Sequence, residues 1–171
     1  MVHIYYGDGK GKTTAAIGLA ARAAGSRMKV LFVQFLKTEF SGERHTLSHT
    51  ENITLSFAPV ELKFTFNMNE EEKAKASKLF RKIFDDSVTK VFTEKYDMIV
   101  LDEIFSAIEA GMISEHDVYE FVSNVPKNLE VVMTGHNPPE RILALADYIT
   151  EMKKIRHPYD KGVQARFGIE F

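Results

Sequence analysis

The stretch GDGKGKTT, residues 7–14, holds the side chains of this sequence that are best suited to chemistry on a phosphate. It lies between a β-rich run, Val2–Tyr6, and an alanine-rich helical pattern over residues 13–24. A glycine-rich loop in that setting exposes backbone N–H groups, and the helix N-terminus adds partial positive charge. Lys12 would reach the outer phosphates of a nucleotide, and the hydroxyl of Thr13 would coordinate Mg²⁺. The loop therefore predicts a nucleotide site.

The glycine spacing of this loop departs from the general phosphate-loop pattern in one place. The pattern G-x-x-x-x-G-K-[ST] puts its first glycine at position 6, where this chain has Tyr6, and the glycine follows at Gly7. A glycine-rich turn with an accidental lysine is the alternative, but the strand-to-helix setting favours nucleotide binding. The pattern does not indicate which reaction the nucleotide undergoes.

Two carboxylates follow another apolar run. The run YDMIVLDE, residues 96–103, ends in Asp102 and Glu103. In phosphate-loop proteins a carboxylate at the end of a neighbouring buried strand holds the Mg²⁺ shell, and Asp102 is our choice for that role. Glu103 has other roles open to it: a base for water, as in many ATPases, or a ligand of metal or ribose. The alternative for the pair is a solvated strand end.

The elements that must position these residues alternate between strands and helices. Apolar runs predict buried strands of a parallel sheet, and three- and four-residue apolar spacing predicts helices. We expect strands at residues 2–6, 29–36, 53–57, 96–103, 129–135 and 148–152. We expect helices at residues 13–24, 70–95, 104–110, 114–124 and 137–146, with caps at Ser114 and Asn137. Residues 37–50 read as polar and irregular.

This alternation predicts an α/β protein with a three-layer α/β/α arrangement and a mostly parallel sheet, a RecA-like P-loop NTPase fold. At 171 residues, the chain suits a single domain over residues 1–171.

The amino-acid composition limits the classes of partner that the protein is expected to bind. The formal net charge of −2 gives no electrostatic case for nucleic acid or membrane, and small molecules fit better. The absence of cysteine excludes disulfides, thiolate metal sites and cysteine nucleophiles. No apolar stretch is long enough to span a bilayer, and residues 1–12 lack the layout of a signal peptide. We expect a cytoplasmic protein.

Several segments, in this order, resemble one family, the phosphate-loop type of ATP:corrinoid adenosyltransferases. The resemblance covers nearly the whole chain, and the shortened loop of that family explains the displaced glycine. Asp8 stands where the family usually has asparagine, and His136 where many relatives have arginine. The matching segments are GDGKGKTTAA, ARAAG, VQFLK, IVLDEI, VVMTGHNPPERILALAD and, the most specific of them, TEMKKIRHPYDKGVQARFGIEF.

The resemblance implies a reaction between ATP and a reduced corrinoid. Co(I) of the corrinoid attacks C5′ of ATP, a Co–C bond forms and triphosphate leaves. The triphosphate still lies on the loop, but the ribose carbon faces the corrinoid. No acid or base is needed, and Lys12, Thr13 and Glu103 act by positioning. The expected ATP contacts are Gly7, Asp8, Gly9, Lys10, Gly11, Lys12, Thr13, Thr14 and Arg22, and the expected metal shell is Thr13, Asp102 and Glu103.

The same resemblance implies further contacts and partners. The family uses two aromatic residues in a loop under the corrin ring to remove the lower axial ligand of cobalt. The matching stretch KFTFN offers Phe64 and Phe66, which would otherwise alternate on a strand and pack against the core. The family also implies a homodimer and an electron-donating reductase such as a flavoprotein.

Two other functions stay open for the loop and the carboxylates taken alone. An ATPase or kinase would use Glu103 as its base and release ADP. A nucleotide-dependent binding switch would hold ATP unchanged. A metal site at His45 and His49, which have helical i, i+4 spacing, is disfavoured because no acidic partner follows in a metalloprotease pattern.

Overall fold

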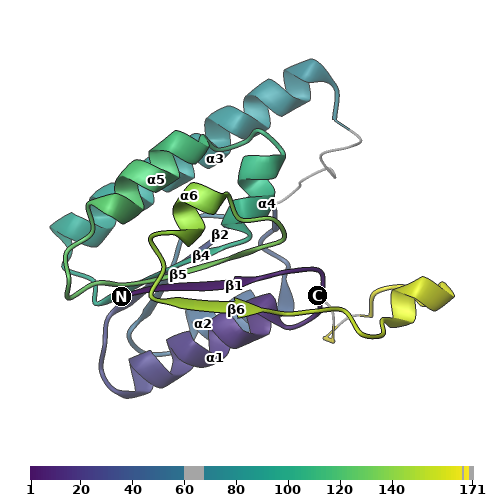
Figure 1. Cartoon of the computed structure of the whole chain (residues 1–171). Helices are drawn as coiled ribbons and strands as arrows, with labels where there is room; N and C mark the ends of the chain where they lie inside the picture. The colour runs from purple at the N-terminus through teal and green to yellow at the C-terminus, as the bar shows by residue number, and fades with distance from the viewer. Residues whose placement is uncertain (60–67, 167, 170–171) are drawn as a thin grey trace.

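The computed structural model describes residues 1–59, 68–166 and 168–169, and its centre is a parallel sheet (Figure 1). Among these residues six strands form the sheet in the order β3-β2-β4-β5-β1-β6, and every paired neighbour runs parallel. The carboxyl ends of the strands therefore meet at one edge. The strands are β1 (Val2–Tyr6), β2 (Val30–Gln34), β3 (Ile53–Leu55), β4 (Met98–Asp102), β5 (Glu130–Gly135) and β6 (Tyr148–Glu151).

Helices cover both faces of this sheet, as Figure 1 shows. One face carries α1 (Lys12–Gly25) and α2 (Gly42–Ser48). The other face carries α3 (Glu70–Thr93), α4 (Ile104–Glu109), α5 (Glu115–Ser123) and α6 (Glu140–Leu143). A short 3₁₀ turn, η2 (Pro158–Lys161), follows β6. The predicted three-layer α/β fold is confirmed. None of the described helices combines the length and the apolar character that a bilayer span requires.

Strand β2 shows why the central strands read as continuous apolar runs. Leu31 and Val33 pack into the layer of α3, whereas Val30 and Phe32 pack into the layer of α1, and all four are at most 1% exposed. Successive side chains of a strand point to opposite faces, so a strand covered on both faces needs apolar residues throughout. The first polar residue is Gln34, fully buried at the carboxyl end, where the candidate site lies.

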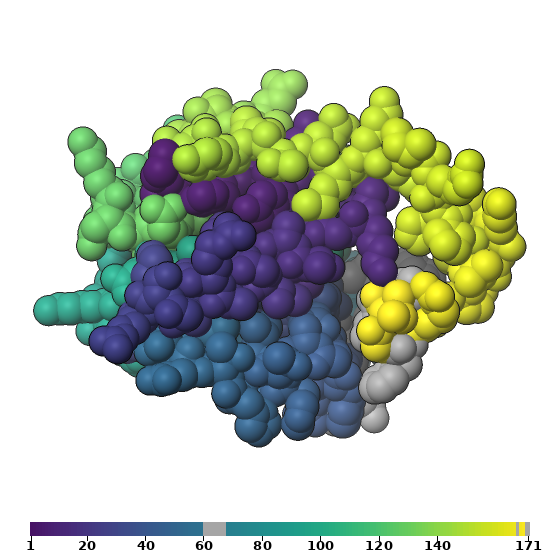
Figure 2. Space-filling view, turned by 90° about the horizontal axis from the view of Figure 1, so that it is seen from below, coloured from purple at the N-terminus to yellow at the C-terminus, as the bar shows by residue number. Residues whose placement is uncertain are grey.

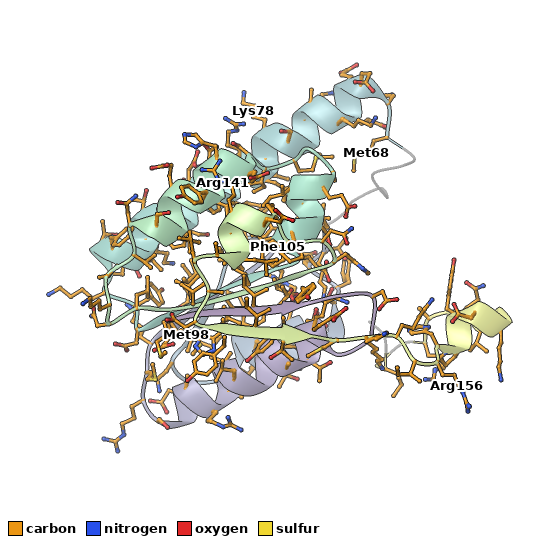
Figure 3. The ribbon with its side chains drawn as sticks, in the orientation of Figure 1. Met68, Lys78, Met98, Phe105, Arg141 and Arg156 are labelled. Carbon is orange, nitrogen blue, oxygen red and sulfur yellow. The ribbon has the colours of Figure 1, made fainter. Side chains whose placement is uncertain are left out.

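Local capping defines the ends of the longer helices. The Asn69 side chain accepts a hydrogen bond from the Glu72 N–H at 2.9 Å, and the Glu72 carboxylate accepts one from the Asn69 N–H at 3.0 Å. This capping box sets the start of α3 at Glu70, where the sequence predicts that the helix begins. The predicted cap of α5 is confirmed, because Ser114 Oγ accepts from the Asp117 N–H. Arg141 of α6, labelled in Figure 3, contacts α5. Its guanidinium lies over the ring of Tyr119, 3.7 Å from the ring centroid.

Two expectations about elements are wrong. The sequence predicts irregular structure for residues 37–50, but this stretch contains α2, whose inward face is Arg44 and Leu47. The sequence also predicts a cap at Asn137, but α6 begins after Pro139, and the Asn137 amide instead donates to Glu109 Oε1 at 3.0 Å. In both places a tertiary hydrogen bond or packing contact overrides the local signal. The two phenylalanines of KFTFN lie outside the described residues.

Candidate active site

The phosphate loop joins β1 to α1 at the carboxyl edge of the sheet, and the end of β6 braces it. The Gly9 N–H donates to the Met152 carbonyl at 2.6 Å, and a Cβ on Gly9 would lie only 2.5 Å from that oxygen. Gly7 and Gly11 have φ angles of 110° and 115°, in the left-handed region that favours glycine. Asp8 Oδ1 accepts from the Lys154 N–H at 2.9 Å. The loop geometry thus depends on a strand end more than 140 positions later in the chain.

The two loop residues expected to contact phosphate and metal, Lys12 and Thr13, are the first two residues of α1. Lys12 Nζ donates to the Gly9 carbonyl at 2.8 Å, so the ammonium lies back across the loop, and the residue is only 8% exposed. Thr13 Oγ1 donates to Asp102 Oδ1 at 2.9 Å. The structure therefore brings the loop threonine and the carboxylate of β4 into direct contact.

Asp102 is fully buried and is surrounded by donors. Besides Thr13, the hydroxyl of Thr134 donates to Oδ1 at 2.7 Å and the amide of Gln34 donates to Oδ2 at 3.3 Å. Lys37 Nζ lies 3.4 Å from Oδ2. A buried carboxylate needs such partners, because removing an ionised group from water without them is costly.

Sequence reasoning missed these three partners of Asp102. Gln34 and Thr134 lie at the ends of apolar strands, and Lys37 follows one closely. A polar residue at the carboxyl end of a buried run is a usable signal, because such ends meet at one edge of a parallel sheet.

Glu103 follows Asp102 but faces a different environment. Its backbone is left-handed, with φ 59°, and it precedes the first turn of α4. The N–H of Glu103 donates to Thr134 Oγ1 at 2.9 Å, and its Oε2 accepts from Ser106 Oγ at 2.6 Å. A non-glycine residue in this backbone region costs energy and persists where the surroundings hold it. The Glu103 side chain lines a cavity that Asp102 does not reach.

This cavity has a volume of about 790 Å³. The loop and the start of α1 contribute one part of its wall, including Lys12 and Thr13. Lys37 and α2 contribute another part, and Gly168 with Ile169 contributes a third. Lys10 Nζ donates to the Ile169 carbonyl at 3.0 Å, and Figure 2 shows the yellow C-terminal segment on the same face of the molecule as purple α1.

Not every residue expected at the site is brought to this cavity. Arg22 lies in the last turn of α1, about 15 Å along the helix axis from Lys12, and is not part of the cavity wall. Phe64 and Phe66 are outside the described residues.

Of the two histidines with i, i+4 spacing, His45 lies in α2 and His49 is the residue that follows its last turn. The rings of His45 and His49 are 4.8 Å apart between centroids. Among the described residues, no group of three or more His, Cys, Asp or Glu side chains is arranged to hold a metal ion.

Comparison with known proteins decides between the possible functions of this site. The model of the family ATP:corrinoid adenosyltransferase BtuR/CobO/CobP matches residues 1–171. The chain belongs to this family. It is an adenosyltransferase, an enzyme that moves the adenosyl group of ATP to a corrinoid. The match favours this activity over the ATPase and the binding switch that the loop alone leaves open.

Curated relatives agree with the family match over the full length of this adenosyltransferase. The corrinoid adenosyltransferases of Escherichia coli K12 and Salmonella typhimurium LT2 are each 31% identical over 172 residues, which are 100% of this chain and 85% of the relative. The corrinoid adenosyltransferase of a Sinorhizobium species is 30% identical over 173 residues, 100% of this chain and 80% of the relative.

A solved structure supports the fold of this adenosyltransferase. EssC (ATPases 2 and 3) from Geobacillus thermodenitrificans superposes with a TM-score of 0.50 at 12% identity. The match covers 98% of this chain and 34% of that much longer chain. At this identity the likeness concerns the fold alone, and it agrees with a P-loop NTPase-like sheet.

Proposed function

We propose that this adenosyltransferase binds MgATP with its triphosphate against residues 7–14, so that the ribose C5′ faces the Co(I) centre of a corrinoid. The observation that supports this most directly is the 2.9 Å hydrogen bond from Thr13, which lines the cavity, to the buried carboxylate of Asp102. This bond joins the phosphate loop to the edge of the sheet where the strands have their carboxyl ends. The cavity volume of about 790 Å³ falls in the range of small-molecule sites.

The chemical step is a displacement at carbon. Co(I) donates an electron pair to C5′, the Co–C bond forms as the C5′–O bond breaks, and the electrons of that bond leave with the triphosphate. No proton leaves either reactant, so no general base is required. The chain has to align the reacting atoms and to stabilise the charge that develops on the leaving triphosphate. Lys12, which lies across the loop, is the first cation available for that task.

The oxygen groups around the loop fit Mg²⁺. Thr13, Asp102 and Glu103 supply a hydroxyl and two carboxylates, and Mg²⁺ commonly takes one or two carboxylates together with substrate phosphates and water. Because Glu103 lines the cavity and Asp102 is fully buried, Glu103 and Thr13 would meet the shell of the ion while Asp102 orients Thr13. Bound Mg²⁺ would neutralise part of the triphosphate charge.

Other parts of the proposal rest on the family resemblance. Phe64 and Phe66 would contact the corrin ring, the enzyme would act as a homodimer, and a reductase such as a flavoprotein would supply the electron that makes Co(I). A single domain over residues 1–171 and a cytoplasmic location stay predictions from the sequence.

An anaerobic assay with MgATP and chemically reduced cob(I)alamin tests the proposal. We expect a light-sensitive alkylcobalt spectrum and one triphosphate for each adenosylated corrinoid. Unchanged Co(I) with accumulation of ADP and phosphate would contradict it and would support an ATPase that uses Glu103. A parallel reaction with Glu103→Gln separates the two. An ATPase would lose its base and with it the formation of ADP, whereas the transferase would lose one group of the Mg²⁺ shell, slow down and still form the Co–C bond, because Co(I) remains its nucleophile.

A further inference from the structure

Lys37 is a cation in the cavity wall that comes from the β2 side of the site. It lies three residues after the end of β2, and its side chain is 24% exposed. Its Nζ is 2.6 Å from Glu43 Oε1 on α2 and 3.4 Å from Asp102 Oδ2. Both Lys37 and Lys12 line the same cavity. Besides Lys10 and Lys12 of the loop, the cavity thus has a third lysine, which comes from outside the phosphate loop.

The two carboxylates beside Lys37 have other donors. Glu43 Oε1 also accepts from the Gln34 amide at 2.9 Å, and Asp102 accepts from Thr13 and two further side chains. An ammonium has three N–H donors. Among the described residues, Lys37 uses one of them in a hydrogen bond, to Glu43. Lys37 can therefore donate to a third group without leaving either carboxylate unpaired.

The ion pair keeps Lys37 charged inside a partly buried wall. Burial by itself lowers the pKa of Lys37, but attraction to Asp102 and Glu43 outweighs burial, so the pKa lies above its ordinary value. Burial raises the pKa of Glu43, but the hydrogen bond and the charge of Lys37 outweigh it and hold that pKa below its ordinary value. At neutral pH, Lys37 is therefore positively charged and Glu43 is negatively charged.

Breaking the C5′–O bond adds negative charge to the triphosphate, and preorganised cations stabilise such charge well where water is limited. We propose that Lys37 is a further triphosphate-binding residue of this enzyme, in addition to the lysines of the loop. When ATP occupies the cavity, the Lys37 ammonium turns from Glu43 toward the triphosphate, and Glu43 is its counter-ion in the free enzyme. This inference rests on the proposed function, because it requires the triphosphate to lie on the loop.

A purely structural role for the same ion pair makes a different prediction. If the pair only fastens α2 to the sheet, Lys37→Met and Glu43→Gln break the same contact and change ATP binding in the same direction. If Lys37 binds phosphate, the two substitutions act in opposite directions. Lys37→Met removes the ligand, whereas Glu43→Gln removes a competing carboxylate from a lysine that stays in place.

Titration calorimetry with inorganic triphosphate and with ATP, each in the presence of Mg²⁺, measures this difference. We expect Lys37→Met to weaken triphosphate binding about 10- to 100-fold, the range for a hydrogen bond to a charged group. We expect Lys37→Arg to retain part of the affinity and Glu43→Gln to bind triphosphate more tightly. Lys82→Met is the matched control, because it breaks an exposed pair with Asp86 and should leave both affinities unchanged.

The wild-type cob(I)alamin assay separates failure of this inference from failure of the proposed function. Unchanged triphosphate affinity in Lys37→Met, or equal losses in Lys37→Met and Glu43→Gln, overturns the role of Lys37 while a wild-type enzyme that releases triphosphate upholds the function. A wild-type enzyme that neither binds nor releases triphosphate overturns both. Far-ultraviolet circular dichroism of each variant confirms that the compared proteins are folded.

Discussion

Thr134 is the residue that connects the two neighbouring carboxylates of the site. Its hydroxyl donates to Asp102 Oδ1 at 2.7 Å and accepts from the Glu103 N–H at 2.9 Å, and the residue is fully buried. One oxygen thus orients the buried carboxylate of Asp102 and the backbone of Glu103, whose half-buried side chain lines the cavity. Because neither partner reaches bulk water easily, a residue of the same shape without the hydroxyl leaves both with one hydrogen bond fewer.

We predict that Thr134→Val lowers the free energy of unfolding by about 1–3 kcal/mol, the cost of leaving a buried polar group without its partner. Thr134→Ser, which keeps the hydroxyl, is the matched control and should lose less. Urea denaturation followed by circular dichroism measures both values. Equal stability of the valine and serine variants would show that the hydroxyl contributes nothing to the fold.

Asp8 provides a second test at the residue scale, through pH. The backbone hydrogen bond from Lys154 is the main reason why the pKa of Asp8 lies below its ordinary value. A carboxylate with a lowered pKa keeps its interaction above the unfolded-state pKa and loses it as pH falls through the folded-state pKa. The contact between the loop and the segment after β6 should therefore be constant at neutral pH and weaken only in acid.

Hydrogen exchange of the Lys154 amide measures this contact. We expect its protection factor to stay constant from about pH 8 to about pH 5 and to fall at lower pH, as the carboxylate becomes protonated. Asp8→Ala should remove the protection at every pH. Asp8→Asn, which restores the usual residue of the family, should keep part of it without the acid-dependent loss. A pH-dependent loss in Asp8→Asn would assign the titration to another group.

At the scale of elements, the end of β5 and the start of α4 approach each other closely. Gly135 has a φ of 149°, and a Cβ built on it would lie 2.6 Å from Phe105 Cβ and 3.0 Å from the Ser106 nitrogen. Phe105, labelled in Figure 3, is fully buried in the same layer as α6 and leaves no room for adjustment. This contact places Glu103 and Thr134 beside one another.

We predict that Gly135→Ala lowers the free energy of unfolding by about 1–3 kcal/mol through overpacking, with strained backbone adding to the loss. Gly18→Ala is the control, because Gly18 is exposed on α1 and a Cβ there meets nothing within 4 Å. That substitution should raise stability by about 0.5–1 kcal/mol, the difference in helix propensity. Thermal denaturation of both variants measures whether each substitution lowers or raises the stability. A Gly135→Ala protein as stable as the wild type would contradict the close approach of β5 and α4.

The helix α2 is the element of the site that the sequence did not predict. It has seven residues, too few to be stable alone in water. Its Arg44 donates to Gln34 Oε1 at 3.1 Å and to the Ser56 carbonyl at 2.7 Å. These contacts come from β2 and from the segment after β3. Because they stabilise the helix from outside its own sequence, no local pattern predicts it.

At the scale of the whole molecule, the site depends on segments that are far apart in the chain. The loop residue Asp8 binds the backbone of Lys154, and Lys10 donates to the carbonyl of Ile169. The C-terminal block, the most specific part of the family resemblance, therefore has a structural task beside the phosphate loop. We therefore expect nucleotide binding at the loop to stabilise the entire fold through these contacts.

We predict that MgATP raises the melting temperature of the enzyme by mass action, by the equivalent of about 2.7 kcal/mol at a free concentration 100 times the dissociation constant. Differential scanning fluorimetry with and without MgATP measures the shift. Lys12→Ala should lose most of it, and chelation of Mg²⁺ with EDTA should reduce it in the wild type. The same shift in Lys12→Ala would mean that ATP binds away from the loop.

The sequence by itself determined the order of strands and helices except α2, together with the phosphate loop, the two carboxylates and the family. These features follow from patterns within short segments, namely apolar period, glycine spacing and cap residues. Only the tertiary structure decided that Thr134, Gln34 and Lys37 surround Asp102, and that Glu43 on a short polar helix is paired with Lys37. The physical reason is that parallel strands bring their carboxyl ends together in an order that the linear sequence does not contain, so residues distant in the chain share one buried charge.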